Sequence, residues 1–197
     1  MAIADDVKAD LRRHSLARRD LVSHQEAHDA AQQVCARALK LLLSLRPSLE
    51  GVVVSAYWPI RSELNTRPLL EALHGQGAAV ALPVMTAVRR PLLFRAFDPF
   101  DDELVKGPFG LSEPAPEKPE LHPEIVFAPL AAFDRKGGRL GYGGGIYDAT
   151  LHTLRARRPV TAIGLAYALQ EAELAPREAH DEPLDFVVTE RETISFD

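Results

Sequence analysis

Short, continuously apolar stretches recur along the chain and are separated by stretches with helical periodicity. The apolar stretches are 52–57 (VVVSAY), 78–82 (AAVAL), 92–97 (LLFRAF, with polar breaks), 125–130 (IVFAPL), 160–166 (VTAIGLA) and 185–189 (DFVVT). Continuous apolarity over five or six residues is typical of a strand that is buried on both faces. We therefore expect a sheet in which most strands are parallel.

Between the strands the pattern predicts helices. They are expected over residues 5–20, from Ser23 to just before Pro47, from Thr66 to about Gly75 and Gly77, and from about Gly145 to about Arg157. Ser23 and Glu26 form a capping-box pattern, and Thr66 is placed to cap the third helix. Alternating strands and helices predict an α/β fold with a largely parallel central sheet flanked by helices. Because nothing marks a boundary, we expect residues 1–197 to form a single domain.

Composition narrows the class of protein. Hydrophobic residues make up 46% and charged residues 26% of the chain, as in soluble globular proteins. No apolar run approaches the ~20 residues that span a bilayer, and the charged N-terminus does not resemble a secretory signal. The one cysteine, Cys35, lies on the apolar face of a predicted helix, where we expect core packing. These features predict a cytoplasmic protein without a membrane partner.

The negative charge is concentrated in one segment. Residues 98–124 contain eight acidic residues and two lysines, a balance of −6, whereas the whole chain carries −5. This proline-containing segment is expected to be a solvated connection. Residues 129–158 are positive, but the patch is small and suits one polyphosphate better than a duplex. Nucleic acid is therefore not expected as a partner.

A glycine-rich segment joins the fourth strand to the last helix. Within nine residues it contains Gly137, Gly138, Gly141, Gly143, Gly144 and Gly145. Glycines let the backbone present its N–H groups to an anion, and the following helix N-terminus adds partial positive charge. Arg139 and Lys136 supply full charges, and Asp148 is placed to hold Mg²⁺ beside bound phosphates. The segment lacks the Walker A ending and the Rossmann glycine spacing. The alternative is a flexible connection, but such a connection would not require an arginine, two tyrosines and an aspartate among its glycines.

The sequence from 125 to 151, IVFAPLAAFDRKGGRLGYGGGIYDATL, resembles the signature of the 5-formyltetrahydrofolate cyclo-ligases, or methenyltetrahydrofolate synthetases. Five shorter pieces resemble other landmarks of that family in the same order. They are KADLR (8–12), AYWPIRSELNT (56–66), LPVM (82–85), FGLSEP (109–114) and AHDEPLDFVVTE (179–190). The resemblance therefore extends over nearly the whole chain.

The resemblance implies a role for individual residues. The ATP-binding residues would be Lys8, Arg12, Arg139, Gly141, Tyr142, Gly143, Gly144, Gly145 and Tyr147. The substrate-binding residues would be Trp58, Glu63, Tyr142 and Ile146, and Mg²⁺ would be held by Asp148 and Asp181. Arg139 and Tyr147 would be catalytic. Lys8 and Arg12 lie four residues apart and so share a helix face, although a solvated basic face continuing to Arg18 and Arg19 is the alternative.

The family's reaction converts 5-formyltetrahydrofolate to 5,10-methenyltetrahydrofolate with ATP. By resemblance, the formyl oxygen attacks the γ-phosphate, N10 of the folate closes the ring and phosphate leaves. ATP and a reduced folate are the implied partners, Mg²⁺ is the implied cofactor, and we expect a monomer. Two residues depart from the signature: Ile146 replaces a tyrosine and Ala149 an arginine. Two alternatives therefore stay open: an ATP-dependent enzyme on the same scaffold with another acceptor, and a nucleotide or folate sensor without turnover.

Overall fold

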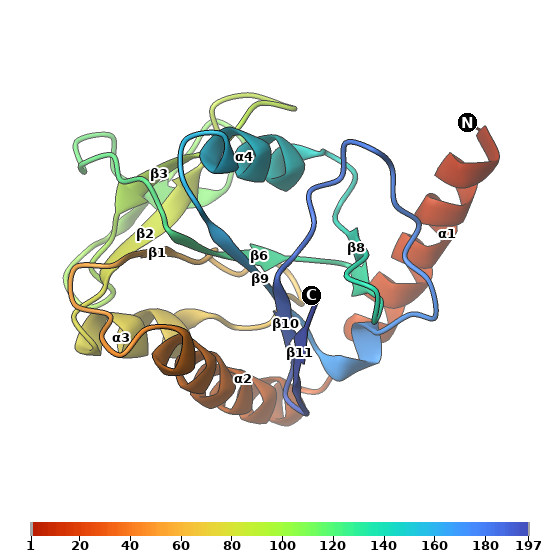
Figure 1. The fold of residues 1–197 in the computed structure, drawn as a ribbon, viewed down its shortest axis with the longest axis horizontal. Coiled ribbons are helices and arrows are strands. Elements are labelled where there is room, and N and C mark those ends of the chain that lie inside the picture. Colours follow the sequence, from red (N-terminus) through yellow and green to blue (C-terminus); the bar gives the residue numbers. More distant parts are fainter. Residues whose placement is uncertain (1, 197) are drawn as a thin grey trace.

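The computed structural model describes residues 2–196 and contains a seven-stranded central sheet (Figure 1). The strand order is β11-β10-β9-β6-β1-β2-β3. The strands are β1 (Val53–Ser55), β2 (Ala79–Val84), β3 (Leu93–Ala96), β6 (Ile125–Pro129), β9 (Thr161–Leu165), β10 (Phe186–Val188) and β11 (Thr193–Ser195). The five inner strands are parallel, whereas the edge strands β3 and β11 are antiparallel to their neighbours. The six predicted strands and the mainly parallel sheet are confirmed, and β11 is an addition.

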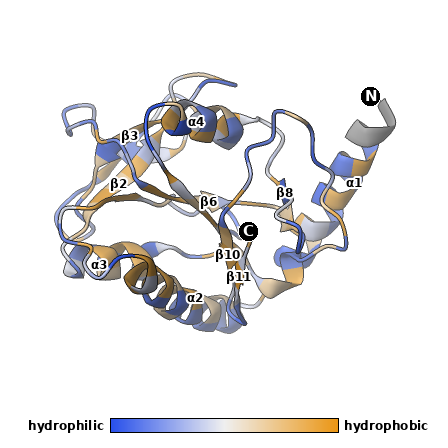
Figure 2. Cartoon of the chain, viewed as in Figure 1, coloured by the Kyte–Doolittle hydropathy of each residue, from blue (hydrophilic) through white to orange (hydrophobic). Residues whose placement is uncertain are grey.

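Helices cover both faces of this sheet. They are α1 (Ala2–Arg19), α2 (His24–Leu45), α3 (Arg67–Gly75) and α4 (Ile146–Arg155). Figure 1 shows α2 and α3 on one face and α4 on the other, while α1 lies at the end of the sheet. Side chains alternate accordingly along β6: Ile125 and Phe127 pack in the cluster of α2 and α3, and Val126 packs in the cluster of α4. Figure 2 shows the resulting hydrophobic strands and the amphipathic α2 and α4.

The predicted caps have different outcomes. Ser23 and Glu26 form the expected capping box, and Arg46 ends α2 just before Pro47. Thr66 is at the N-cap of α3, but its side chain makes no capping hydrogen bond, so this prediction is wrong. Its backbone is helical rather than extended, and its hydroxyl instead donates to the carbonyl of Tyr57 at 2.5 Å. Thr66 thus ties the start of α3 to the chain that leaves β1.

The acidic segment is more ordered than a solvated connection, so that prediction is wrong in part. It contains a hairpin of β4 (Leu104–Lys106) and β5 (Ser112–Pro114). Glu113 on β5 is 4% exposed and accepts the N–H of Met85 at 2.9 Å. The hairpin therefore supports the loop that follows β2. Cys35 is buried in the core as expected.

The glycine-rich segment begins with a second small hairpin, formed by β7 (Ala132–Phe133) and β8 (Arg139–Leu140). The carboxylate of Asp134 is buried in its turn and accepts the N–H groups of Lys136, Gly138 and Ala175, each at 2.8 Å. These three bonds fix the entry to the glycine loop. A short 3-10 helix, η1 (Ala168–Gln170), packs against α1. Among residues 2–196, no helix is both long and apolar enough to cross a membrane.

The order of the strands creates a crevice at the carboxyl ends of β1 and β6. These strands are neighbours, but β1 leads through α3 to β2 on one side, whereas β6 leads through α4 to β9 on the other. The two connections diverge, and ligands of open α/β sheets bind in the crevice that such a divergence leaves. The segments 56–66 and 130–148 leave these two strands, so the fold brings together the motifs that the sequence singled out.

Candidate active site

A pocket of about 1020 Å³ occupies this crevice. Its size is at the upper end for small-molecule sites. One wall is the glycine loop and the first turn of α4, and the opposite wall consists of the chain after β1 and the loop after β2. Lys8 and Arg12 of α1 and residues 178–181 close one end. The pocket is therefore built from segments far apart in the sequence.

The glycine loop has a positive φ at two glycines, a conformation that other residues rarely adopt. Gly143 has a φ of 94° and lies beside the guanidinium of Arg12. Gly145 has a φ of 61° and precedes α4 as its N-cap, so no side chain caps the first turn of this helix. Arg12 donates from Nε to the carbonyl of Gly141 at 2.8 Å, which anchors the loop to α1. The helix N-terminus and the arginine together favour an anion at this wall.

Arg139 and Asp148 form an ion pair inside this wall. Nη2 of Arg139 donates to Oδ1 of Asp148, and the two side chains are 5% and 19% exposed. The same Oδ1 accepts the N–H of Glu182 at 3.1 Å. Nη1 of Arg139 is buried and has no hydrogen-bond partner within the described residues. A buried, unpartnered guanidinium nitrogen lining a pocket is suited to receive a phosphate oxygen.

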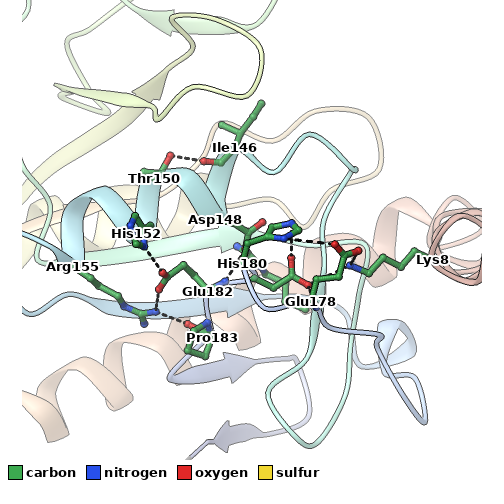
Figure 3. A network of polar contacts seen from close by, with 12 residues as sticks. Lys8, Ile146, Asp148, Thr150, His152, Arg155, Glu178, His180, Glu182 and Pro183 are labelled. Atoms are coloured by element: carbon green, nitrogen blue, oxygen red, sulfur yellow. Dashed lines mark hydrogen bonds and ion pairs between the residues drawn. The ribbon is translucent and has the colours of Figure 1, made fainter. Parts of the chain in front are cut away.

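The segment around residues 178–183 spans from α1 to α4 (Figure 3). At one end Lys8 donates to Glu178 at 2.8 Å and to Asp181 at 3.3 Å. Burial opposes the charge of Lys8, but its hydrogen bonds and the two acids outweigh this and raise its pKa. At the other end Arg155 of α4 donates to the carboxylate of Glu182 at 2.9 Å. The segment is thus held at one end by α1 and at the other end by the last residue of α4.

Asp148 and Asp181 both line the pocket and lie near each other, since Asp181 directly precedes Glu182, which donates to Asp148. Each carboxylate uses one oxygen for these contacts, and within the described residues the other oxygen makes no hydrogen bond. Mg²⁺ often takes one or two carboxylates and completes its shell with phosphate oxygens and water. The pair fits such an ion. Among the side chains that the structure describes, no group of three potential metal ligands is assembled.

A second polar cluster lies at the opposite wall around Glu63, which is 8% exposed. Its Oε1 accepts the hydroxyl of Tyr142 at 2.6 Å, and its Oε2 accepts the N–H of Ile60 at 2.9 Å. Burial raises the pKa of Glu63, while these two hydrogen bonds oppose the rise. Each oxygen retains a lone pair, so the carboxylate can still accept N–H groups from a ligand.

Aromatic side chains surround the space between the two clusters. Burial, and then the charge of Glu63, raise the pKa of Tyr147, so this residue remains a neutral hydroxyl donor. The guanidinium of Arg139 lies 6.0 Å from the centre of its ring. Trp58 lines the pocket, and Arg67 lies over its ring at 4.3 Å. Phe97 packs edge-on with Trp58, with the two ring centres 5.8 Å apart.

The sequence matches the model of the 5-formyltetrahydrofolate cyclo-ligase family over residues 4–190. Among curated relatives, a 5-formyltetrahydrofolate cyclo-ligase of Haemophilus influenzae is 35% identical, with 81% of this chain and 84% of the relative covered. The enzyme of that name from Escherichia coli is 32% identical, with 87% and 94% covered. The solved structure of Aquifex aeolicus 5,10-methenyltetrahydrofolate synthetase has a TM-score of 0.76 at 30% identity, covering 96% of this chain and 92% of its own.

The chain belongs to the 5-formyltetrahydrofolate cyclo-ligase family. Every residue to which the sequence assigned a catalytic, ATP-binding, substrate-binding or metal-binding role lines the one pocket described above. The placement agrees with a common site, while the individual roles stay predictions. Lys136 is an exception among the charges expected near the phosphates. It lies in the β7–β8 turn outside the pocket lining, because its backbone N–H is held by Asp134.

Several lining residues of this cyclo-ligase site were not foreseen. They are Tyr57, Ile60, Pro83, Met85, Arg89, Leu92, Leu111, Ser112, Pro129, Leu140, Glu178 and His180. Met85 ends the LPVM landmark, and Leu111 and Ser112 belong to FGLSEP, so these two motifs contained usable information. His180 belongs to the AHDEPLDFVVTE landmark, whereas Glu178 precedes it and belongs to no motif. The alternative of a solvated basic face continuing to Arg19 is wrong at that residue, which is 2% exposed.

Proposed function

We propose that this chain catalyses the ATP-dependent cyclisation of 5-formyltetrahydrofolate to 5,10-methenyltetrahydrofolate, with release of ADP and phosphate. Membership of the family and relatives named for this reaction support the proposal. The observation that carries it in the structure is one pocket with an anion-binding wall and a facing wall of acid and aromatic side chains. A substrate with a triphosphate and a flat, N–H-rich ring system would need both walls.

The glycine-loop wall would receive ATP. The triphosphate would lie against the N-terminus of α4, with Arg139 beside the γ-phosphate and with Arg12 and Lys8 at the end of the pocket that α1 closes. Nη1 of Arg139 is available to a phosphate oxygen without breaking a hydrogen bond. To bind a phosphate, Lys8 would have to break its ion pair with Glu178 or with Asp181. Such a charge-neutralising wall is what phosphoryl transfer requires.

Mg²⁺ would be held by Asp148 and Asp181, two lining carboxylates in each of which one oxygen accepts no hydrogen bond from the residues that the structure describes. When bound, the ion would neutralise charge on the phosphates and orient them. Its use by this chain remains a proposal. Asp148 would then share its carboxylate between Arg139 and the ion, so the guanidinium is placed beside the same phosphates.

The folate would lie along the facing wall. Its pterin would donate N–H groups to Glu63 and pack on Trp58, since a carboxylate complements paired donors and an aromatic ring complements a flat one. Tyr147, a neutral hydroxyl on the glycine-loop wall, would donate to the formyl or phosphoryl oxygen. The formyl oxygen would attack the γ-phosphorus and displace ADP. N10 would then add to the activated carbon and lose its proton, and phosphate would depart. Positioning and charge neutralisation suffice for these steps, so no protein nucleophile is required.

The test is the absorbance of 5,10-methenyltetrahydrofolate after mixing protein, 5-formyltetrahydrofolate, ATP and Mg²⁺. A rise that needs all components is expected, and chelation of divalent ions should abolish it. No rise, together with ATP hydrolysis in the presence of another acceptor, would favour a different substrate. Mg²⁺-dependent ATP binding without any ADP release would favour a sensor. A monomeric state and a cytoplasmic location stay predictions of the sequence.

A further inference from the structure

Arg19, the last residue of α1, is a buried arginine outside the pocket lining. It is 2% exposed, and none of the ion pairs formed within residues 2–196 includes it. Its Nε donates to Oγ of Ser62 at 3.1 Å, and its Nη1 donates to the hydroxyl of Tyr142 at 2.8 Å. Burying a guanidinium without a carboxylate partner is unfavourable. Packing alone is therefore a poor explanation for an arginine at this position.

Both contacts of Arg19 lead to Glu63. Ser62 directly precedes Glu63 in the chain, and Tyr142 donates its hydroxyl to Oε1 of Glu63 at 2.6 Å. The turn that presents Glu63 is tight, since the preceding Arg61 has a φ of 52°, a conformation that residues other than glycine rarely adopt. Arg19 thus contacts the side chain of Ser62, the neighbour of Glu63, and reaches the Glu63 carboxylate through Tyr142.

We propose that Arg19 is a positioning residue for folate recognition: by holding Ser62 and Tyr142 it fixes the Glu63 carboxylate in the orientation that receives the pterin. The inference rests on the proposed function, in which Glu63 binds the folate. Tyr142 belongs to the glycine loop, so the same contact also joins the ATP wall to the folate wall. Arg19 itself touches neither substrate.

The charge of Arg19 adds a second, measurable effect. The titratable or charged groups facing Glu63 are Arg19 from α1, Tyr57 and Arg61 from the chain after β1, and Tyr142 and Tyr147 from the glycine-loop wall. Burial, and then the charge of Glu63, raise the pKa of all three tyrosines, which stay neutral. Burial raises the pKa of Glu63 as well, and the two arginines oppose that rise. Removing Arg19 should therefore raise the pKa of Glu63 further.

The experiment is a titration of Arg19→Met with 5-formyltetrahydrofolate, followed by the fluorescence of Trp58, the single tryptophan of the chain. Losing a hydrogen bond from a charged donor should weaken folate binding about tenfold or more, while ATP affinity falls by less than about threefold. The pH at which folate affinity is half lost on acidification should move upward. Arg19→Lys keeps the charge and should recover part of both effects. Arg18→Met removes the same charge from the exposed neighbouring position and is the matched control.

Tyr142→Phe provides a second test that does not depend on the folding of the Arg19 variant, because Tyr142 is 38% exposed. It should also weaken folate binding, and adding Arg19→Met should cost less than the sum of the two changes. Fully additive effects would exclude a path through Tyr142. Wild-type folate affinity and pH midpoint in Arg19→Met, or in Tyr142→Phe if the other variant does not fold, overturn the proposal. Equal loss of folate and ATP affinity would mean a purely structural role and also overturn it.

The same titration separates this inference from the proposed function. If the wild-type protein binds 5-formyltetrahydrofolate and Arg19→Met binds it equally well, only the role of Arg19 is wrong. If the wild-type protein gives no fluorescence response and no heat of binding with 5-formyltetrahydrofolate, the proposed function is wrong, and the role of Arg19 falls with it.

Discussion

Replacing Asp148 with asparagine should affect stability, nucleotide binding and turnover in different directions. Asp148 is the carboxylate partner of Arg139, whose side chain is only 5% exposed. Asp148→Asn keeps the shape and an acceptor for the N–H of Glu182, but it removes the negative charge. Arg139 is then left as a buried cation with a weaker partner, at a wall built to receive anions.

The size of each effect follows from this pair. A hydrogen bond to a charged group contributes about 1.5–3 kcal/mol, so the free energy of unfolding should fall by about that amount. For a chain of this length the melting temperature should drop by about 3–12 °C. Metal-free ATP should bind about tenfold more tightly, because Arg139 no longer has to share its charge with a carboxylate. Turnover with Mg²⁺ should fall at least a hundredfold, since a proposed metal ligand is lost.

The assays are thermal unfolding, calorimetric titration with ATP in chelator, and methenyltetrahydrofolate absorbance. Asp185→Asn is the matched control: Asp185 pairs with Arg155, the last residue of α4, and neither residue lines the pocket. It should leave metal-free ATP affinity unchanged. If Asp148→Asn binds metal-free ATP no better than wild type, the Arg139–Asp148 pair does not limit anion binding. Normal turnover would remove Asp148 from the site.

Three further changes test other parts of the pocket. Glu63→Gln should weaken binding of 5-formyltetrahydrofolate more than binding of ATP. Because burial raises the pKa of Glu63, the wild-type affinity for folate should fall on acidification at a higher pH than an ordinary glutamate would give. The variant should lose this pH dependence in fluorescence titrations. Gly143→Ala should reduce ATP affinity by about tenfold, since a φ of 94° strains alanine by about 1–2 kcal/mol, whereas Gly75→Ala, with an ordinary φ and open space, should not. Ile146→Tyr should lower KM for the folate in steady-state assays by supplying a hydroxyl at the pocket wall.

The sheet and its helices could be predicted because each depends on local information. Buried parallel strands are continuously apolar, and both the capping box at Ser23 and the stop at Pro47 are encoded within a few residues. The β4–β5 hairpin could not be found this way, because its strands are short and its acids suggest solvent. Glu113 is buried where the N–H of Met85, 28 residues earlier in the chain, donates to its carboxylate. Such a contact is a property of the tertiary structure.

The sequence predicted the site residues that belong to a recognisable motif. It did not predict residues such as Arg19, which contact the site only through other side chains. The glycine loop, Glu63 and the two proposed metal ligands were found through their motifs. Arg18 and Arg19 are adjacent and identical, yet the first is exposed and the second is 2% exposed. Successive residues of a helix point about 100° apart, so one position faces solvent and the next faces the glycine loop. With charged residues on both faces of α1, no hydrophobic pattern indicates which arginine turns inward. That depends on where Tyr142 and Ser62 lie, which only the assembled fold determines.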